Sequence, residues 1–467
     1  MTDTLVLDGC AVSTVDDAGT EHERGHVVIS DGVIQAVGSG PAPASVTAGL
    51  PPGSVRDASG CLATPGLVNT HHHLYQWATR GFTPDSGLFD WLRALYPVWV
   101  GLDADVTRAA ATAGLARLAL TGCTTSSDHH YVFPARGGDL LAATIDAAAS
   151  VGLRLHATRG SMDLGASAGG LPPDDVVEDT DAALAATEDA VLRHHDPAPG
   201  AMVRVGVAPC SPFSVTTRLL TGAATLARRL GVRLHTHLAE TLDEDDYCRA
   251  TFGRSPTEHL DALGWLGGDV WLAHCVHLDS SAVARLAATG TAVAHCPGSN
   301  ARLGAGICPV RALLDAGVPV GLGVDGAASN EHGGLADELR NAAYWARLHG
   351  GPTALSTRDA LRLATRGGAR CLGREDEIGS LEPGKRADVA LWRVDGPWHG
   401  DIADPAVIAQ GRDYLQTLAR YKQDATAAGA NFVEVQNTML FATVGHRTDA
   451  LVGTDAREVL SAGVMKS

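Results

Sequence analysis

Between residues 66 and 370, short apolar runs alternate with longer stretches rich in Ala, Leu and Arg. Short apolar runs bounded by turn signals are typical of buried strands, whereas Ala- and Leu-rich stretches favour helices. The pattern predicts strands at 66–69, 124–127, 154–157, 204–208, 233–236, 270–273, 292–295 and 321–324. Helices are expected between them, for example at 107–121, 140–151, 181–194, 218–230 and 280–288. This alternation predicts an α/β fold with a (β/α)8 TIM-like barrel, although an open doubly wound sheet would give a similar pattern.

The two ends of the chain have β character without the intervening helices. Strand-like runs at 4–7, 26–30 and 33–37 are divided by Asp-Gly turns, and β character returns at 381–393. We expect a second, small β-sandwich-like domain built from residues 1–62 and 375–467, beside a catalytic barrel of residues 63–374. Residues 402–437 are expected to be polar and helical, and strands at 449–452 and 458–460 to close the small sheet. We assign no function to the segment 402–439.

Composition narrows the classes of partner. The chain has 467 residues, 45% of them hydrophobic, and a formal net charge of −17. Such an acidic protein is repelled by nucleic acid and by anionic membranes, so we expect a small-molecule partner. The nine cysteines are odd in number and form no CxxC pair, so a disulfide framework or a thiolate zinc site is not expected. Neither a signal peptide nor a long apolar span is visible in the sequence. We therefore expect a cytoplasmic protein. Barrels of this kind often pair into homo-oligomers, an option that the sequence leaves open.

The segment 65–73, PGLVNTHHH, ends an apolar strand with three histidines. Alternate residues of an extended chain face the same way, so His71 and His73 can bind one metal ion while His72 faces elsewhere. A histidine-rich surface loop is the alternative. The position favours a metal site, because the functional loops of a barrel begin where its strands end.

The segment 234–240, LHTHLAE, repeats this arrangement. His235 and His237 share a face, and Glu240 follows the strand end, where it can serve as acid and base towards a metal-bound water. A structural histidine beside a solvated glutamate would give the same letters.

Two further strand ends carry single candidates. In WLAHCVH (271–277) His274 or His277 can orient the attacking water, and in GLGVDG (321–326) Asp325 can bind the metal and accept a proton. Taken singly, each histidine is as readily a core residue, and the Asp-Gly pair is more often a turn. Together, four strand ends offer nitrogen and oxygen ligands that suit Zn²⁺ or Fe²⁺.

In combination and in order, these motifs resemble the amidohydrolase superfamily, in the branch of aminohydrolases that deaminate purines, pterins and triazines. The resemblance runs from residue 1 to about residue 395 and includes AHCPGSN (294–300) and GLGVDGAASN (321–330). It implies that His71, His73, His237 and Asp325 bind the metal. It also implies that Glu240 transfers protons, that His274 orients the water, and that Asp325 takes its proton. His295 is a further candidate near these ligands, but we do not expect it to bind the metal.

Lysine usage separates subfamilies within this resemblance. Two-metal relatives bridge their ions with a carboxylated lysine from the middle of the barrel. Here the lysines are Lys385, Lys422 and Lys466, and none lies within the predicted barrel. We therefore expect one divalent metal ion per subunit, Zn²⁺ in the first place and Fe²⁺ as the alternative.

The resemblance implies hydrolytic deamination of an aminated aromatic heterocycle. Conversion of 8-oxoguanine to urate and ammonia is the first expectation, and guanine, isoguanine, a pterin or an s-triazine are alternatives. Gln76, Arg159 and Cys210 are candidate substrate-binding residues, since they follow or end predicted strands. A non-catalytic metal-binding barrel is the alternative from another class, but such a protein needs no proton-transferring Glu240. The HxE…PCxxC signature of nucleic-acid deaminases is absent from the sequence.

Overall fold

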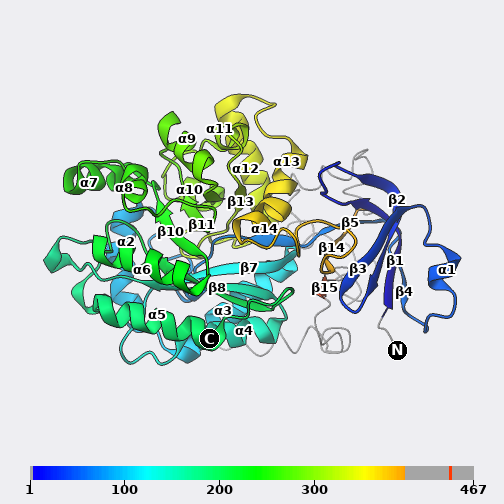
Figure 1. Cartoon of the computed structure of the whole chain (residues 1–467), viewed down its shortest axis with the longest axis horizontal. Helices are drawn as coiled ribbons and strands as arrows, with labels where there is room; N and C mark the ends of the chain where they lie inside the picture. Colours follow the sequence, from blue (N-terminus) through cyan, green and yellow to red (C-terminus); the bar gives the residue numbers. More distant parts are fainter. Residues whose placement is uncertain (1–3, 395–440, 444–467) are drawn as a thin grey trace, which may run out of the picture.

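The computed structural model describes residues 4–394 and 441–443. Eight parallel strands close into a barrel, and their order around it follows the chain from β6 to β13. Figure 1 shows barrel strands such as β7, β8, β10 and β11 with helices on their outside. The strands are β6 (Leu67–Asn69), β7 (Cys123–His130), β8 (Arg154–Ser161), β9 (Val203–Pro209), β10 (Leu234–Leu238), β11 (Val270–His274), β12 (Ala292–His295) and β13 (Val320–Leu322). The predicted barrel is confirmed, and the alternative of an open sheet is excluded by the pairing of β13 with β6.

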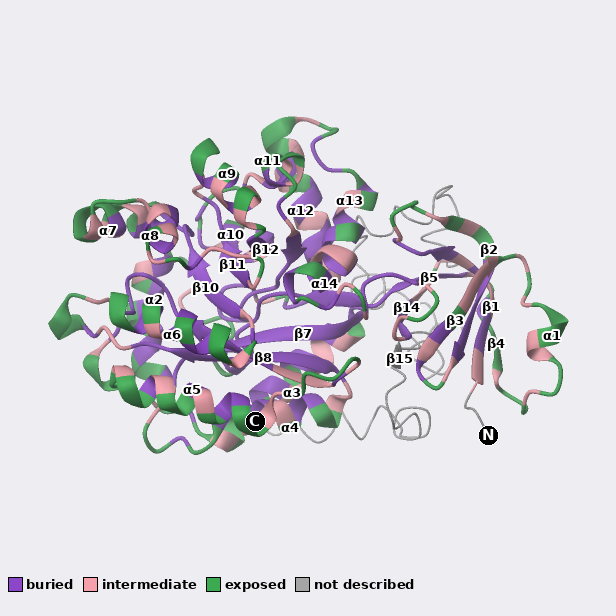
Figure 2. Ribbon diagram, viewed as in Figure 1, coloured by how far each residue is buried: buried purple, intermediate pink, exposed green. Residues whose placement is uncertain are grey.

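Helices surround the barrel, and their polar faces point to solvent while the strands are buried (Figure 2). They are α2 (Leu88–Trp99), α3 (Ala104–Leu120), α4 (Leu140–Val151), α5 (Thr180–His194), α6 (Thr217–Leu230), α7 (Leu242–Phe252), α8 (Pro256–Ala262), α9 (Ser280–Thr289), α10 (Pro297–Arg302), α11 (Val310–Asp315), α12 (Leu335–Gly350), α13 (Thr357–Arg362) and α14 (Gly368–Cys371). Shorter turns are η1 (Leu74–Thr79), η2 (Ala166–Ala168), η3 (Asp174–Val176) and η4 (Leu363–Gly367). Local signals set their ends: at α4, Asp139 accepts a hydrogen bond from the Ala142 amide, and Gly152 closes the helix with a φ of 83°.

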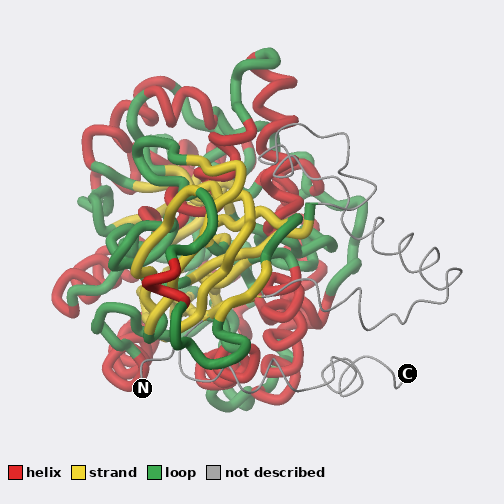
Figure 3. The backbone as a smooth tube through the Cα atoms, turned by 90° about the vertical axis from the view of Figure 1, so that its right-hand side faces the viewer, coloured by secondary structure: helices red, strands yellow, loops and turns green. Residues whose placement is uncertain are grey.

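A separate sheet of seven strands lies beside the barrel and contains segments from both ends of the chain (Figure 3). It comprises β1 (Thr4–Ser13), β2 (Glu21–Ser30), β3 (Val33–Ser39), β4 (Val55–Asp57), β5 (Cys61–Pro65), β14 (Asp388–Arg393) and β15 (Phe441–Thr443), with the short helix α1 (Ala44–Thr47) at its edge. β14 pairs antiparallel with β5, which leads directly into β6 of the barrel. The expectation that the late β segment rejoins the first strands is therefore confirmed.

The structure differs from the predicted elements in detail. Residues 381–387 form a turn rather than a strand, because Gly384 has a φ of 92° and the strand begins only at Asp388. The predicted domain boundary between residues 62 and 63 falls within β5. The helix expected at 402–437 and the strands expected at 449–452 and 458–460 lie outside the described residues. Within the described residues, no helix combines the length and apolar character that a membrane crossing requires.

Candidate metal centre and active site

The five side chains that motif spacing singled out as metal ligands or water-orienting residues meet at the carboxyl end of the barrel. His71 and His73 follow β6, His237 lies on β10, His274 ends β11 and Asp325 follows β13. All five are buried, with at most 8% of the residue exposed. Parallel strands bring their carboxyl ends to one rim, so residues far apart in sequence share one small space.

A chain of hydrogen bonds fixes the ring of His71. The backbone carbonyl of Trp271 can only accept, so the His235 ring donates to it through Nδ1 at 2.8 Å. His235 Nε2 then accepts from His71 Nδ1, also at 2.8 Å. His71 therefore keeps an unprotonated Nε2, which is the form of imidazole that binds a metal ion.

The same logic applies to the other two histidines. His73 donates from Nδ1 to the carbonyl oxygen of His129 at 2.6 Å, and His237 donates from Nδ1 to that of Cys210 at 2.7 Å. Each ring thus presents a free Nε2, and the two Nε2 atoms lie 3.1 Å apart. Two facing lone pairs at this distance repel each other unless a cation or a proton lies between them.

Asp325 completes the group. Its Oδ1 lies 3.3 Å from His71 Nε2 and 3.2 Å from His73 Nε2, whereas its Oδ2 accepts hydrogen bonds from the Ser299 and Ser329 hydroxyls at 2.6 and 2.9 Å. The Asp325 carboxylate thus has one oxygen anchored by two hydroxyl donors and the other directed at the Nε2 atoms of His71 and His73.

These donors fit a divalent metal ion. His71, His73, His129 and His237 can each offer one ligand atom within 4.8 Å of the others, and so can His71, His274 and Asp325. Within residues 4–394, His71 Nε2 and Asp325 Oδ1 are buried and make no hydrogen bond. Buried polar atoms are almost always satisfied, so these two atoms indicate a missing partner. Imidazole nitrogens with one carboxylate oxygen suit Zn²⁺ or Fe²⁺.

Backbone strain marks the same strand ends. Ala239, His274, Cys275 and Asp325 have φ values of 51°, 68°, 51° and 61°, in the left-handed region that residues other than glycine rarely adopt. Such conformations cost about 1–3 kcal/mol each and tend to persist at functional sites. Here they turn the chain sharply after β10, β11 and β13, which aims the side chains into the barrel mouth.

Glu240 lies beside this cluster and contacts His274. Its Oε2 is 3.5 Å from His274 Nε2, while His274 Nδ1 lies 3.0 Å from Asn300 Oδ1. Burial, together with the negative charges of Asp325 and Glu244, raises the pKa of Glu240 well above its ordinary value. The Glu244 carboxylate accepts from the amides of Ala239 and Glu240 at 2.8 and 3.0 Å, which holds the strained turn in place.

His129 is a member of the cluster that motif reasoning missed. It is fully buried on β7, donates from Nε2 to the Ala208 carbonyl at 2.9 Å, and stacks on the His237 ring with centroids 4.8 Å apart. The predicted strand stopped at residue 127, whereas β7 continues to His130. The signal available in the sequence was the pair His129-His130, which follows the predicted strand 124–127 after the single residue Asp128.

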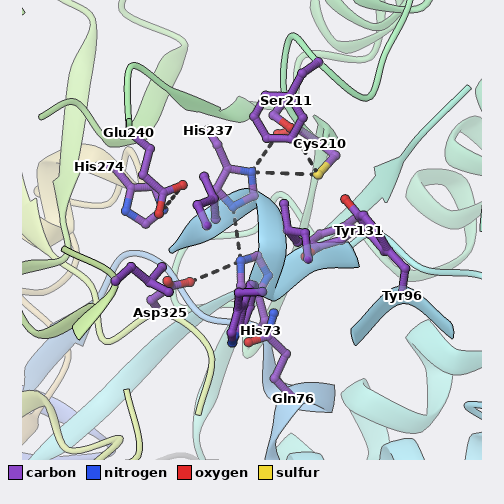
Figure 4. A pocket seen from close by; sticks show the side chains of 15 residues that line it. His73, Gln76, Tyr96, Tyr131, Cys210, Ser211, His237, Glu240, His274 and Asp325 are labelled. Carbon is purple, nitrogen blue, oxygen red and sulfur yellow. Dashed lines mark hydrogen bonds and ion pairs between the residues drawn. The ribbon is translucent and has the colours of Figure 1, made fainter. Parts of the chain in front are cut away.

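A small cavity of about 30 Å³ opens onto the cluster (Figure 4). Its lining residues lie at or after the ends of six strands, on η1 and α2, and directly after α10. His73, His237, Glu240, His274 and Asp325 form its polar end. Its apolar walls are Leu88, Trp91, Leu92, Tyr96, Tyr131, Phe213 and Leu303. Ligand pockets usually measure about 300–1,000 Å³, so a bound heterocycle needs more space than this cavity provides.

Of the three predicted substrate-binding residues, two line the cavity and one does not. Gln76 and Cys210 line the cavity. Arg159 does not line it, because Glu178 holds the guanidinium through two hydrogen bonds of 2.8 and 2.6 Å and the cation lies 4.0 Å from the Phe133 ring centroid. His295 is buried at the end of β12 but belongs to neither metal-binding group.

Comparison with known proteins agrees with this geometry. The model of the amidohydrolase family matches residues 62–437. The chain belongs to the amidohydrolase family. It is therefore an enzyme of a family that binds a divalent metal ion, and its relatives include deaminases and an aminohydrolase, which hydrolyse carbon–nitrogen bonds.

Individual amidohydrolases are similar over most of their length. The 8-oxoguanine deaminase of Pseudomonas aeruginosa is 48% identical over 378 residues, which cover 79% of this chain and 82% of that protein. An isoxanthopterin deaminase from an unknown prokaryotic organism is 39% identical, covering 86% of this chain and 87% of that protein. The zinc complex of atrazine chlorohydrolase TrzN from Arthrobacter aurescens TC1 superimposes with a TM-score of 0.85 at 33% identity, over 98% of this chain and 99% of that one.

Proposed function

We propose that this amidohydrolase deaminates 8-oxoguanine to urate and ammonia with one zinc ion per subunit, bound by His71, His73, His237 and Asp325. The observation that carries the proposal is the convergence of three imidazole Nε2 atoms and one carboxylate oxygen, each with its other polar atom already bonded. A purely structural zinc site needs neither a proton-transferring acid nor a cavity beside its ligands. Here Glu240 and His274 lie next to the donors, on the wall of a cavity.

His71, His73, His237 and Asp325 would hold the cation, which when bound would supply Lewis acidity towards the attacking water. The protein's own groups then handle the protons. Asp325 Oδ1 is free to accept a proton from the attacking water, because Oδ2 is occupied by two hydroxyl donors. His274 donates from Nδ1 to Asn300, so its Nε2 accepts a hydrogen bond from the water and orients it.

Glu240 acts on the heterocycle. Burial raises its pKa and so favours the protonated carboxyl group, whose proton passes to the ring nitrogen beside the carbon under attack. Protonation makes this carbon more electrophilic. Water adds to it, the bond to the exocyclic nitrogen breaks, and the nitrogen takes up a proton and leaves as ammonia. One water is consumed and one carbonyl is formed, so no redox partner is needed.

Two observations support a purine with an amide-like edge as substrate. The first is the 48% identity with the 8-oxoguanine deaminase of Pseudomonas aeruginosa. The second is Gln76, which is fully buried and lines the cavity, and whose Nε2 and Oε1 both lack a hydrogen bond of ordinary geometry within residues 4–394. A free carboxamide can donate and accept side by side, which matches the adjacent N–H and C=O groups of an oxidised purine.

The test is a substrate panel run on protein whose metal content is measured in the same preparation. Ammonia release is followed with 8-oxoguanine, guanine, isoguanine, isoxanthopterin and an aminotriazine. We expect the highest kcat/KM with 8-oxoguanine and about one zinc ion per chain. Preference for a pterin or a triazine would replace the proposed substrate while leaving the machinery intact, and no ammonia from any of them would overturn the proposal.

A variant tests the machinery separately. Glu240→Gln removes the transferable proton but no metal ligand, so we expect kcat to fall about 10²–10⁴-fold with the zinc content unchanged. The matched control is Glu188→Gln, on the surface of α5, where the carboxylate pairs with Arg229 at 2.8 Å. Full activity in Glu240→Gln would contradict the assigned role.

A further inference from the structure

A second cavity, of about 450 Å³, lies at the opposite end of the barrel from the metal centre. We call it the basal cavity. Its lining residues come from the beginnings of strands: His156 near the start of β8, Arg204 on β9, Arg233 directly before β10 and Asp269 directly before β11. Because all barrel strands run parallel, the beginnings of strands face away from the rim that holds His237 and Asp325.

The basal cavity contains the half-buried Arg233 and the buried imidazole of His156, each with one buried ring or guanidinium nitrogen that makes no hydrogen bond among the described residues. Within residues 4–394 and 441–443, Arg233 makes no ion pair, and its Nε is buried without a hydrogen-bond partner. The guanidinium lies 5.9 Å from the Trp271 ring centroid. His156 is 2% exposed, and its Nδ1 also lacks a partner. Buried polar groups without partners are rare, so both side chains indicate a ligand.

Nearby acids do not neutralise the arginines. Asp269 accepts from Arg228 at 3.0 Å, and Glu377 is shared by Arg204 and Arg374. The remaining neighbour, Glu375, is paired with Arg370 at 2.6 Å. Three arginines line the cavity, Arg204, Arg228 and Arg233, and a fourth, Arg374, lies close enough to repel a charge on His156. The carboxylates that pair with these four guanidiniums are those of Asp269 and Glu377, so this group of side chains carries a surplus of two positive charges.

Burial and the surplus of positive charge lower the pKa values of Arg233, Arg374 and His156. Burial lowers the pKa of Arg233, and burial with repulsion from Arg154 lowers that of Arg374 to about 10. Burial, followed by repulsion from Arg374, Arg233 and Arg204, lowers the pKa of His156 well below its ordinary value. An anion in the basal cavity would relieve this mutual repulsion, because a buried charge is costly unless it is paired.

We propose that the basal cavity binds a phosphate-type dianion, either inorganic phosphate or the phosphate group of a phosphomonoester. Two uncompensated positive charges match the charge of such a group at neutral pH. The planar guanidinium fork of Arg233 suits two phosphate oxygens, and an imidazole nitrogen of His156 can supply a third contact. The cavity is larger than a phosphate ion needs, which leaves room for the organic part of a phosphomonoester. This site is independent of the proposed deaminase reaction.

The test measures binding to the full-length, zinc-loaded enzyme by calorimetry, at a fixed ionic strength of about 0.15 M set with chloride. The probes are inorganic phosphate, a nucleoside 5′-monophosphate and the corresponding nucleoside. We expect saturable binding of at least one phosphate probe, a higher Tm in its presence, and no binding of the nucleoside at the basal cavity. Whichever phosphate probe binds more tightly identifies the source of the dianion.

Variants locate the bound anion. We expect Arg233→Met to weaken binding at least tenfold and to abolish the Tm shift, while Arg233→Lys, which keeps the charge but loses the fork, binds with intermediate affinity. The control Arg229→Met removes an exposed arginine of α6 that pairs with Glu188, and binding should be unchanged. If Arg233→Met does not fold, Arg204→Met replaces it. Absence of saturable binding, binding unchanged in the folded variant, or binding that disappears only on removal of zinc would overturn the proposal.

Discussion

Loss of His235 should weaken metal binding although this residue is not a proposed ligand. His235 connects the Trp271 carbonyl to His71 Nδ1 through two hydrogen bonds of 2.8 Å, and so dictates which nitrogen of His71 is free. In His235→Leu the His71 ring loses the acceptor for its Nδ1 proton and can rotate or change tautomer. The expected effect is on metal affinity first and on activity as a consequence.

The magnitude follows from the groups left behind. Partners that orient a ligating histidine typically contribute about 10–100-fold in metal affinity, which corresponds to about 1.4–2.7 kcal/mol. In addition, His235→Leu leaves the His71 N–H and the Trp271 carbonyl unpaired in a fully buried place, at about 1–3 kcal/mol each in the free energy of unfolding. The variant should therefore bind zinc at least about tenfold more weakly and unfold at a lower denaturant concentration.

The assay is zinc competition against a chromophoric chelator, combined with urea unfolding of the zinc-free and zinc-loaded protein. His235→Gln is the second variant, because its side-chain oxygen can still accept from His71 Nδ1 and should recover part of the affinity. The control is His259→Leu, a buried imidazole on α8 with no hydrogen bond from either ring nitrogen within the described residues. Zinc affinity in His235→Leu equal to that of the parent enzyme would refute the reasoning about the tautomer chain.

Three further predictions concern the pocket, the junction with the small sheet and the pH dependence of stability. A Cβ at Gly326 would lie 1.7 Å from Gln76 Oε1, so Gly326→Ala should displace the Gln76 carboxamide. We expect kcat/KM to fall about 10-fold or more, mainly through a higher KM. In the control Gly268→Ala, an added Cβ meets open space, and kcat/KM should be unchanged. Asp388→Ala leaves Arg154 buried without its partner at 3.1 Å, so the free energy of unfolding measured in urea titrations should fall by about 3–5 kcal/mol. In the control Asp90→Ala, which removes the exposed pair with Arg93, it should change by less than about 1 kcal/mol. Burial raises the pKa of Glu338 from 4.5 to about 7, so the stability associated with its protonated form is complete below pH 4.5 and is lost as the pH rises through about 7. In the parent protein this group should lower the free energy of unfolding by about 3 kcal/mol between about pH 5 and pH 8. Glu338→Gln should remove most of this fall. An unchanged dependence of the unfolding free energy on pH in the variant would contradict the prediction.

The sequence by itself determined the barrel and where its chemistry lies. Alternating apolar and Ala-rich segments favour parallel strands joined by helices, and the carboxyl ends of such strands lie on one side of the sheet. For this reason the sequence predicted that His71, His73, His237 and Asp325, from three distant motifs, would lie close together, and the structure does bring them together. Their role as metal ligands stays a prediction.

What only the tertiary structure decided are the contacts between strands that are remote in sequence. One example is the chain of hydrogen bonds that runs from Trp271 through His235 to His71. Others are the position of His129 in the cluster and the ion pair between Arg159 and Glu178. All of them depend on side-chain directions that the sequence pattern does not give. The uncompensated arginines of the basal cavity belong to the same class, because charge balance is a property of neighbours in space. Periodicity records which residues face inward, but it holds no information about which inward-facing partner each one meets.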